Sequence, residues 1–207
     1  MDDNTLRELL PEFYNEHNLG MEGGKYEAYV RIEMTKKIVL YIPNFAARKK
    51  AVLKHDIHHL VTGYPSTYTG ETEIGAWEIA SGCKGYWVAW LLNLSGMMTG
   101  LIFNLPKVLQ AFARGRRTKN LYHHLVSDDE VLDMRSTELQ KLLLLDKYPK
   151  NTRPNFADCI LFAGWVIIGL IYSILSIVLL PLVLLYTLYI ITRLRLQRKR
   201  KLINTGL

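Results

Sequence analysis

The chain has 207 residues, 49% of them hydrophobic, and a formal net charge of +7, a size at which one domain with an appendage is expected. Its two cysteines, Cys83 and Cys159, match no disulfide framework, which argues against a disulfide-stapled protein and favours a reducing compartment. The basic residues cluster beside apolar runs, and most aromatic residues lie inside those runs. No nucleic-acid partner is expected, because such surfaces interleave aromatic with basic side chains.

The N-terminal segment is predicted to be helical and to remain in the cytosol. Leu6, Leu9, Leu10 and Phe13 recur at helical spacing. The acidic start of the chain lacks the basic stretch and apolar core of a secretory signal. Between residues 25 and 43 the apolar positions partly alternate and β-branched residues are frequent, so helix and strand both remain open there.

Two helices joined by a turn are predicted next. Asn44 is expected to cap a helix from about Phe45 to Thr62, which ends at Gly63 and Pro65. The turn GYPSTYTG follows, and a second helix is expected over Glu71–Ser81.

Two further segments complete the region before the C-terminal apolar run. The uncharged run Tyr86–Leu105 is interpreted as a buried core helix, an interfacial helix or the wall of a lipid-binding groove. A short helix is predicted in TELQKLLLLDKY, with Thr137 and Gln140 as a capping pair.

The C-terminal region is predicted to enter a membrane. Cys159 to Thr192 are 34 consecutive uncharged residues, whereas one crossing of the hydrocarbon core needs about 20. Six basic residues follow between Arg193 and Lys201, and they are expected to bind anionic phospholipid at the cytoplasmic face. The predicted organisation is a helical domain over 1–157, a membrane segment over 158–192 and a basic cytoplasmic tail over 193–207.

The charges on both sides of the membrane segment favour one topology over another. If the domain and the basic tail both stay in the cytoplasm, the segment must cross an even number of times. We therefore favour a helical hairpin that bends near Gly169 or Pro181, although 34 residues are marginal for two crossings. One long tilted transmembrane helix with a translocated tail is the alternative.

A group of histidines on the first predicted helix indicates a metal site. His55 and His59 are four residues apart and therefore share a helix face, with Asp56 on one flank and His58 on the other. Glu71, in the first turn of the next helix, is the natural further ligand. Imidazole nitrogen with carboxylate oxygen suits Zn²⁺, and also iron or manganese.

Other interpretations of these residues remain open at this point. Histidine pairs at this spacing are common without a metal, and Asp56 could instead pair with Lys54 or Arg48. The box HDIHH also matches one histidine motif of membrane di-iron enzymes, but those need about eight histidines and this chain has six. A zinc protease would require glutamate where Asp56 stands.

The pattern H-D-x-x-H, eleven residues and then E, formed by His55, Asp56, His59 and Glu71, resembles the signature of the coenzyme Q biosynthesis protein four family. The surrounding T-G-Y-P turn and the G-E pair are similar as well. The resemblance implies a mainly helical, membrane-associated protein that binds a divalent metal, usually zinc, at these four positions. This chain would be a divergent member with an added C-terminal membrane segment.

The resemblance also implies a role in ubiquinone biosynthesis. The protein would bind a polyprenylated aromatic intermediate. It would either catalyse the metal-assisted, oxidative removal of the ring carboxylate or organise the other quinone-biosynthesis proteins. A metal near an aromatic carboxylate can withdraw electron density from it. His58 and Glu78 are candidate catalytic residues that would orient metal ligands or move protons. A non-catalytic lipid-binding or scaffold protein with a structural metal stays open as the alternative.

The predicted fold class is therefore mainly α: a helical metal-binding domain followed by a hydrophobic membrane hairpin or transmembrane helix. The predicted location is a membrane, with the N-terminal domain on the cytoplasmic side.

Overall fold

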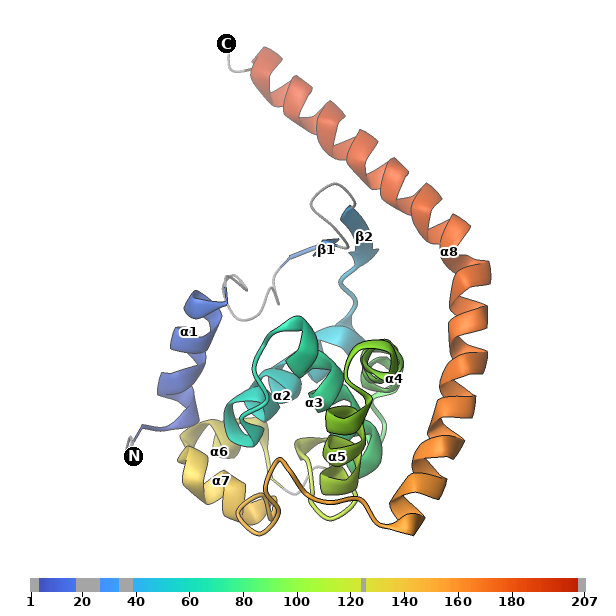
Figure 1. Ribbon diagram of the computed structural model, residues 1–207. Helices are drawn as coiled ribbons and strands as arrows, with labels where there is room; N and C mark the ends of the chain where they lie inside the picture. The colour runs from blue at the N-terminus through green and yellow to red at the C-terminus, as the bar shows by residue number, and fades with distance from the viewer. Residues whose placement is uncertain (1–3, 18–26, 34–38, 124–125, 205–207) are drawn as a thin grey trace. The chain divides into compact units, whose positions relative to one another are not determined.

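The computed structural model describes residues 4–17, 27–33, 39–123 and 126–204 (Figure 1). As predicted, the described residues are mainly helical. The elements in chain order are α1 (Leu6–Glu16), β1 (Tyr29–Glu33), β2 (Val39–Pro43), α2 (Ala46–Thr62), α3 (Tyr68–Ser81), α4 (Trp87–Phe103), α5 (Leu105–Gly115), the 3₁₀ turn η2 (Leu121–His123), α6 (Asp128–Asp133), α7 (Ser136–Leu142) and α8 (Phe156–Asn204). Contacts divide them into two units: α1 with residues 46–171, and the two strands with the rest of α8.

Helix α3 is at the centre of the first unit, where it packs against both α4 and α5. Trp77 is fully buried, and its indole Nε1–H donates to the hydroxyl of Thr118 at 2.9 Å. Close packing of α5 on α3 requires a residue without a side chain at Gly115, because a Cβ there would lie 2.3 Å from the carbonyl oxygen of Trp77. The candidate metal ligand Glu71, in the first turn of α3, therefore belongs to a tightly packed helix.

The predicted helices α2 and α3 are present, with small shifts at their starts. Helix α2 begins at Ala46, close to the predicted start at Phe45, and the side-chain amide of Asn44 donates to the carbonyl oxygen of Glu27 at 2.8 Å. Helix α3 begins at Tyr68, before the predicted start at Glu71, because the hydroxyl of Thr67 accepts the N–H of Gly70.

Two other local predictions are resolved by the structure. In the segment left open between helix and strand, β1 and β2 pair as antiparallel strands, with Tyr29 opposite Pro43. The predicted capping pair Thr137/Gln140 is wrong. Helix α7 begins at Ser136, and the carboxylate of Glu138 accepts the N–H of the preceding residue, Arg135.

Helix α8 is continuous, so the predicted hairpin is wrong. The helix runs from Phe156 to Asn204 through both Gly169 and Pro181. A single proline removes one backbone hydrogen bond and can kink a helix, but reversing the chain requires a turn sequence, which this stretch lacks. Helix α8 is long and apolar enough to cross a membrane, and only 6% of its most apolar 18-residue window is buried.

The beginning of α8 is fixed to the first unit by charged and aromatic contacts. Asp158 is buried and accepts hydrogen bonds from Arg116 and Arg117, each at 2.6 Å. The ring of Trp165 stacks on Trp90 of α4 at a centroid distance of 5.1 Å. Arg116 and Arg117, between α5 and η2, thus hold the start of α8 through their ion pairs with Asp158.

In the second unit, the strands pack on the later part of α8. The backbone N–H of Tyr41 donates to the hydroxyl of Thr187 at 3.2 Å, and that hydroxyl donates to the carbonyl oxygen of Tyr41 at 3.3 Å. Arg193 donates to the phenol oxygen of Tyr29 at 3.3 Å. One basic residue of the tail therefore has a partner within the protein.

Candidate metal centre

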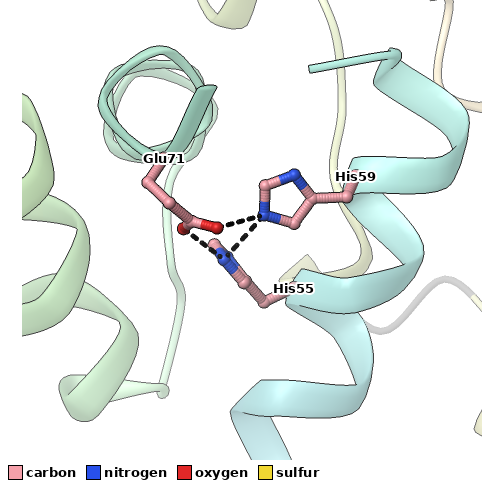
Figure 2. Close-up of side chains that lie close together, drawn as sticks. All are labelled: His55, His59 and Glu71. Atoms are coloured by element: carbon pink, nitrogen blue, oxygen red, sulfur yellow. Dashed lines mark hydrogen bonds and ion pairs between the residues drawn. The ribbon is translucent and has the colours of Figure 1, made fainter. Parts of the chain in front are cut away.

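Three of the four predicted metal ligands converge on one point (Figure 2). His55 and His59 project from one face of α2, and Glu71 reaches them from the first turn of α3. The carboxylate of Glu71 lies 3.2 Å from Nε2 of His55 and 3.1 Å from Nε2 of His59, and the two Nε2 atoms are 3.2 Å apart. The spacing of the histidines on the helix and the length of the turn together account for this geometry.

The other nitrogen of each ring fixes where the lone pairs point. Nδ1 of His59 lies 2.8 Å from the carbonyl oxygen of Tyr64, and Nδ1 of His55 lies 3.0 Å from the carboxylate of Glu78. Both partners can only accept, so both Nδ1 atoms carry a proton. In the neutral rings the Nε2 lone pairs then face each other and the Glu71 carboxylate, an arrangement that needs a cation or a proton between them.

The charges around His55 support the same conclusion. Burial opposes protonation of His55, but the carboxylates of Glu78 and Glu71 raise its pKa well above the ordinary value. Burial also acts against the ionised form of Glu71, yet its contacts with His55 and His59 hold its pKa below the ordinary value. The site therefore attracts positive charge, and its donor set fits Zn²⁺ or another divalent transition metal.

Glu78 is a fully buried carboxylate that bonds to one of the candidate metal ligands, His55. One oxygen accepts Nδ1–H from His55 at 3.0 Å and from His58 at 2.7 Å. The other accepts the hydroxyl of Tyr122 at 2.9 Å and the amide of Asn93. Burial raises the pKa of Glu78, but His55 and His58 outweigh it and hold the pKa below the ordinary value, so the carboxylate stays ionised.

His58 acts through Glu78. Its Nε2 accepts the backbone N–H of Leu121 at 3.0 Å, so its Nδ1 carries the proton that goes to Glu78 and the ring is neutral. Burial lowers the pKa of His58, against the attraction of Glu78, which agrees with a neutral ring. Glu78 bonds to His55 and His58 bonds to Glu78, while their predicted roles in orienting metal ligands and in moving protons stay predictions.

Asp56, the fourth predicted ligand, lies beside the cluster without belonging to it. Its Oδ2 atom is buried and has no hydrogen-bond partner among the described residues, and burial raises its pKa to about 6. The proposed pairing with Lys54 is absent, because Lys54 pairs with Asp128. An unpartnered buried carboxylate oxygen is the kind of atom that an ion satisfies, so coordination by Asp56 stays a prediction.

A cavity of about 360 Å³ opens next to the three ligands. Its polar lining residues are the three candidate ligands, Arg48, Asp56, Ser66, Asn93 and Tyr122, and its apolar lining residues are Ala51, Val52, Ala89, Leu92 and Gly96. His58 and Glu78 are not among its lining residues. The cavity can therefore hold a ligand with an anionic group near the metal position and Arg48, and an apolar part against α2 and α4.

Sequence reasoning missed the residues that support Glu78. Asn93 is one of two amides, with Asn104, in the uncharged run Tyr86–Leu105, and an amide in that mainly apolar run was the one available signal for a buried hydrogen bond. Tyr122 gave no signal, because it reaches Glu78 from a turn 44 residues along the chain.

No protein-family model matches this chain, and neither the curated proteins nor the solved structures gave a match. The assignment of a metal site is therefore based on the geometry of the three residues and on the sequence motif that predicted them.

We expect the purified protein to carry about one divalent metal ion per chain and His59→Ala to carry far less, because two Nε2 atoms and one carboxylate are needed to hold it. Elemental analysis of both proteins measures this. His123→Ala is the matched control: His123 bonds to the carbonyl oxygen of Ser81 and does not line the cavity, so this variant should keep its metal. Equal metal in wild type and His59→Ala would contradict the assignment.

Glu78→Gln should weaken metal binding about 10- to 100-fold, the usual effect of losing a group that orients a ligand. Glu78 now accepts four hydrogen bonds, two at each oxygen. The amide nitrogen of glutamine would replace one of these acceptors with a donor, and loss of the bond from His55 would release the fixed orientation of that ring. Titration with a competing chelator gives the affinity. Glu73→Gln, on the same helix and without a contact to the ligands, should bind like wild type, and equal loss in both variants would refute the orienting role.

Proposed function

We propose that this protein is a membrane-associated metal protein that binds a prenylated aromatic or similar amphipathic lipid, in the biosynthesis of ubiquinone or a related prenyl lipid. The observation that carries the proposal is the cluster of His55, His59 and Glu71 in a cavity lined by both polar and apolar residues. The family resemblance of the motif supplies the pathway.

The metal position supports an enzyme over a purely structural site. If His55, His59 and Glu71 alone hold the ion, they would leave a coordination position free, as catalytic zinc sites do, whereas coordination by Asp56 as well would close the shell with four ligands, as in structural sites. The class of reaction proposed is decarboxylation of a polyprenylated hydroxybenzoate-like substrate, a lyase activity.

The residues of the cavity suit that reaction. A bound divalent cation supplies Lewis acidity, which withdraws electron density from a carboxylate or ring oxygen. Arg48 provides a positive charge for an anionic group, and Val52 and Leu92 provide apolar surface for a tail. The bond between ring and carboxylate breaks, carbon dioxide leaves, and the electron pair stays on the ring carbon, which takes a proton from water. The oxidative variant would consume dioxygen and water, place a hydroxyl at that carbon and release carbon dioxide and hydrogen peroxide.

A second candidate function is a non-catalytic lipid-binding or scaffold protein that organises other quinone-biosynthesis proteins at the membrane. It is favoured by the buried carboxylate of Glu78, which bonds to the candidate ligand His55 and also to His58 and Tyr122, because a rigidly held ligand suits a structural metal.

The proposed location is a membrane, with the helical domain on the cytoplasmic side. Cys83 and Cys159 are both free thiols, which agrees with a reducing compartment. Because α8 is continuous, a single crossing with the domain in the cytoplasm places the basic residues after Thr192 on the opposite side, away from the anionic cytoplasmic leaflet that the sequence predicted as their partner. The positive-inside tendency favours the reverse orientation, so the side of the tail has to be measured.

Deletion of the gene should lower the cell's quinone and cause a carboxylated prenylated precursor to accumulate. His123→Ala should restore the quinone and His59→Ala should not, because only the latter removes a metal ligand. Lipid extraction and mass spectrometry measure both compounds, and the same method should find a prenyl lipid in the detergent-purified protein. A general fall of all intermediates would indicate the scaffold. Unchanged quinones and no bound prenyl lipid would end the assignment.

In a variant lacking both native cysteines, a cysteine at Asn204 should react with an impermeant thiol reagent from outside intact cells, because a single α8 crossing carries that end across. A cysteine at the exposed Lys84 should react only after permeabilisation. If Asn204→Cys also needs permeabilisation, both ends are on one side and α8 does not cross; if Lys84→Cys reacts first, the orientation is reversed.

A further inference from the structure

Helix α4 has an apolar face that the first unit does not cover. Ile102 and Phe103 expose 78% and 65% of their surface, and Leu92 exposes 45%. Trp87 and Leu91 are exposed on the same side of the helix, whereas Asn93 and Met97 on the other side are buried. A continuous apolar face of this kind on an otherwise well-packed unit indicates a surface that is covered in use.

The hydroxyl groups on this face are satisfied without water. The Ser95 hydroxyl donates to the carbonyl oxygen of Leu91 at 3.0 Å, and the Thr99 hydroxyl donates to that of Ser95 at 2.8 Å. Ser176 in α8 bonds in the same way, to the carbonyl oxygen of Tyr172 at 2.9 Å. Bonds of this type let hydroxyls lie in an apolar medium, where no water is present to accept them.

The charges at the two ends of α4 match a membrane surface. Residues 85 to 106 contain no charged side chain, and the run is bounded by Lys84 and Lys107, both exposed. Lysines at the ends of an apolar helix extend to the headgroup region and attract anionic lipid.

Helix α4 also lies against the start of α8 within the first unit. Trp90 stacks on Trp165, and a Cβ at Gly169 would lie 2.2 Å from the sulfur of Met98, so the two helices touch closely. Ile167 and Ile168, beside these contacts on α8, are exposed. The apolar face of α4 is thus next to the helix that is long enough to cross a membrane.

From these observations we infer that the outer face of α4 lies in the lipid bilayer as a second membrane contact, distinct from α8. Its 17 residues span about 26 Å, shorter than the hydrocarbon core of about 30 Å, so α4 lies in the interface instead of crossing. The interfacial interpretation of the uncharged run is therefore the one that this structure favours.

This placement gives the metal cavity a wall that faces lipid, a step that rests on the proposed function. Leu92 and Gly96 line the cavity from α4, and Leu92 is also part of the exposed face. An amphipathic lipid in the bilayer would thus reach the polar side of the cavity across α4 without passing through water.

The test is the depth of α4 in the full-length protein, reconstituted in vesicles of phosphatidylcholine and phosphatidylglycerol. A polarity-sensitive fluorophore is attached to Ile102→Cys in a variant without the native cysteines. Brominated acyl chains should quench it more than aqueous iodide does. Lys141→Cys, exposed on α7, is the matched control and should show the reverse order.

Iodide quenching at Ile102 as strong as at Lys141 would overturn the inference, and so would shielding from both quenchers, which would indicate a protein partner or a second copy. Leu91→Cys provides an independent site on the same face should the first variant not fold. Metal analysis of the same samples separates the two proposals: a metal-loaded protein with a water-exposed α4 ends this inference alone, and a metal-free protein with a buried label ends the metal assignment alone.

Discussion

The buried charge of Glu78 is the constraint on which the rest of the structure depends. Taking a carboxylate out of water costs several kcal/mol unless hydrogen bonds replace its hydration. Here four donors replace it, and they come from three other elements: His55 and His58 on α2, Asn93 on α4 and Tyr122 on η2. A shift of any of these elements would leave part of the charge unsatisfied, so one group on α3 fixes the mutual register of the helices that form the cavity.

The parts of the site that sequence predicted were those with local signals. The four-residue spacing of His55 and His59 needs only a helix, and Glu71 needs only a turn of the right length before the next helix. The partners of Glu78 could not be predicted, because Tyr122 is 44 residues away and only the packing of the whole unit brings it near. The predicted start of α3 was wrong for a smaller reason: the hydroxyl of Thr67 accepts the N–H of Gly70, so the helix begins earlier than predicted.

The wrong hairpin prediction for α8 shows the limit of an argument from charge. The positive-inside tendency constrains which side of a membrane each flank occupies, but it does not act on the backbone between them. The residues around Pro181 are mostly leucine, isoleucine and valine, and no glycine or asparagine pair offers a turn. Local backbone preference therefore decided the conformation, and Pro181 lies within a continuous helix.

The carboxylates of Glu71 and Glu78 act on His55 from opposite sides, and their burial differs. The Glu78 side chain is fully buried, whereas that of Glu71 is 44% exposed. Because electrostatic interactions are stronger away from water, Glu78 fixes the orientation of His55, while Glu71 remains within reach of a ligand that enters the cavity. One fixed and one accessible carboxylate on the same imidazole is the arrangement that our proposed site for a metal and an amphipathic anion requires.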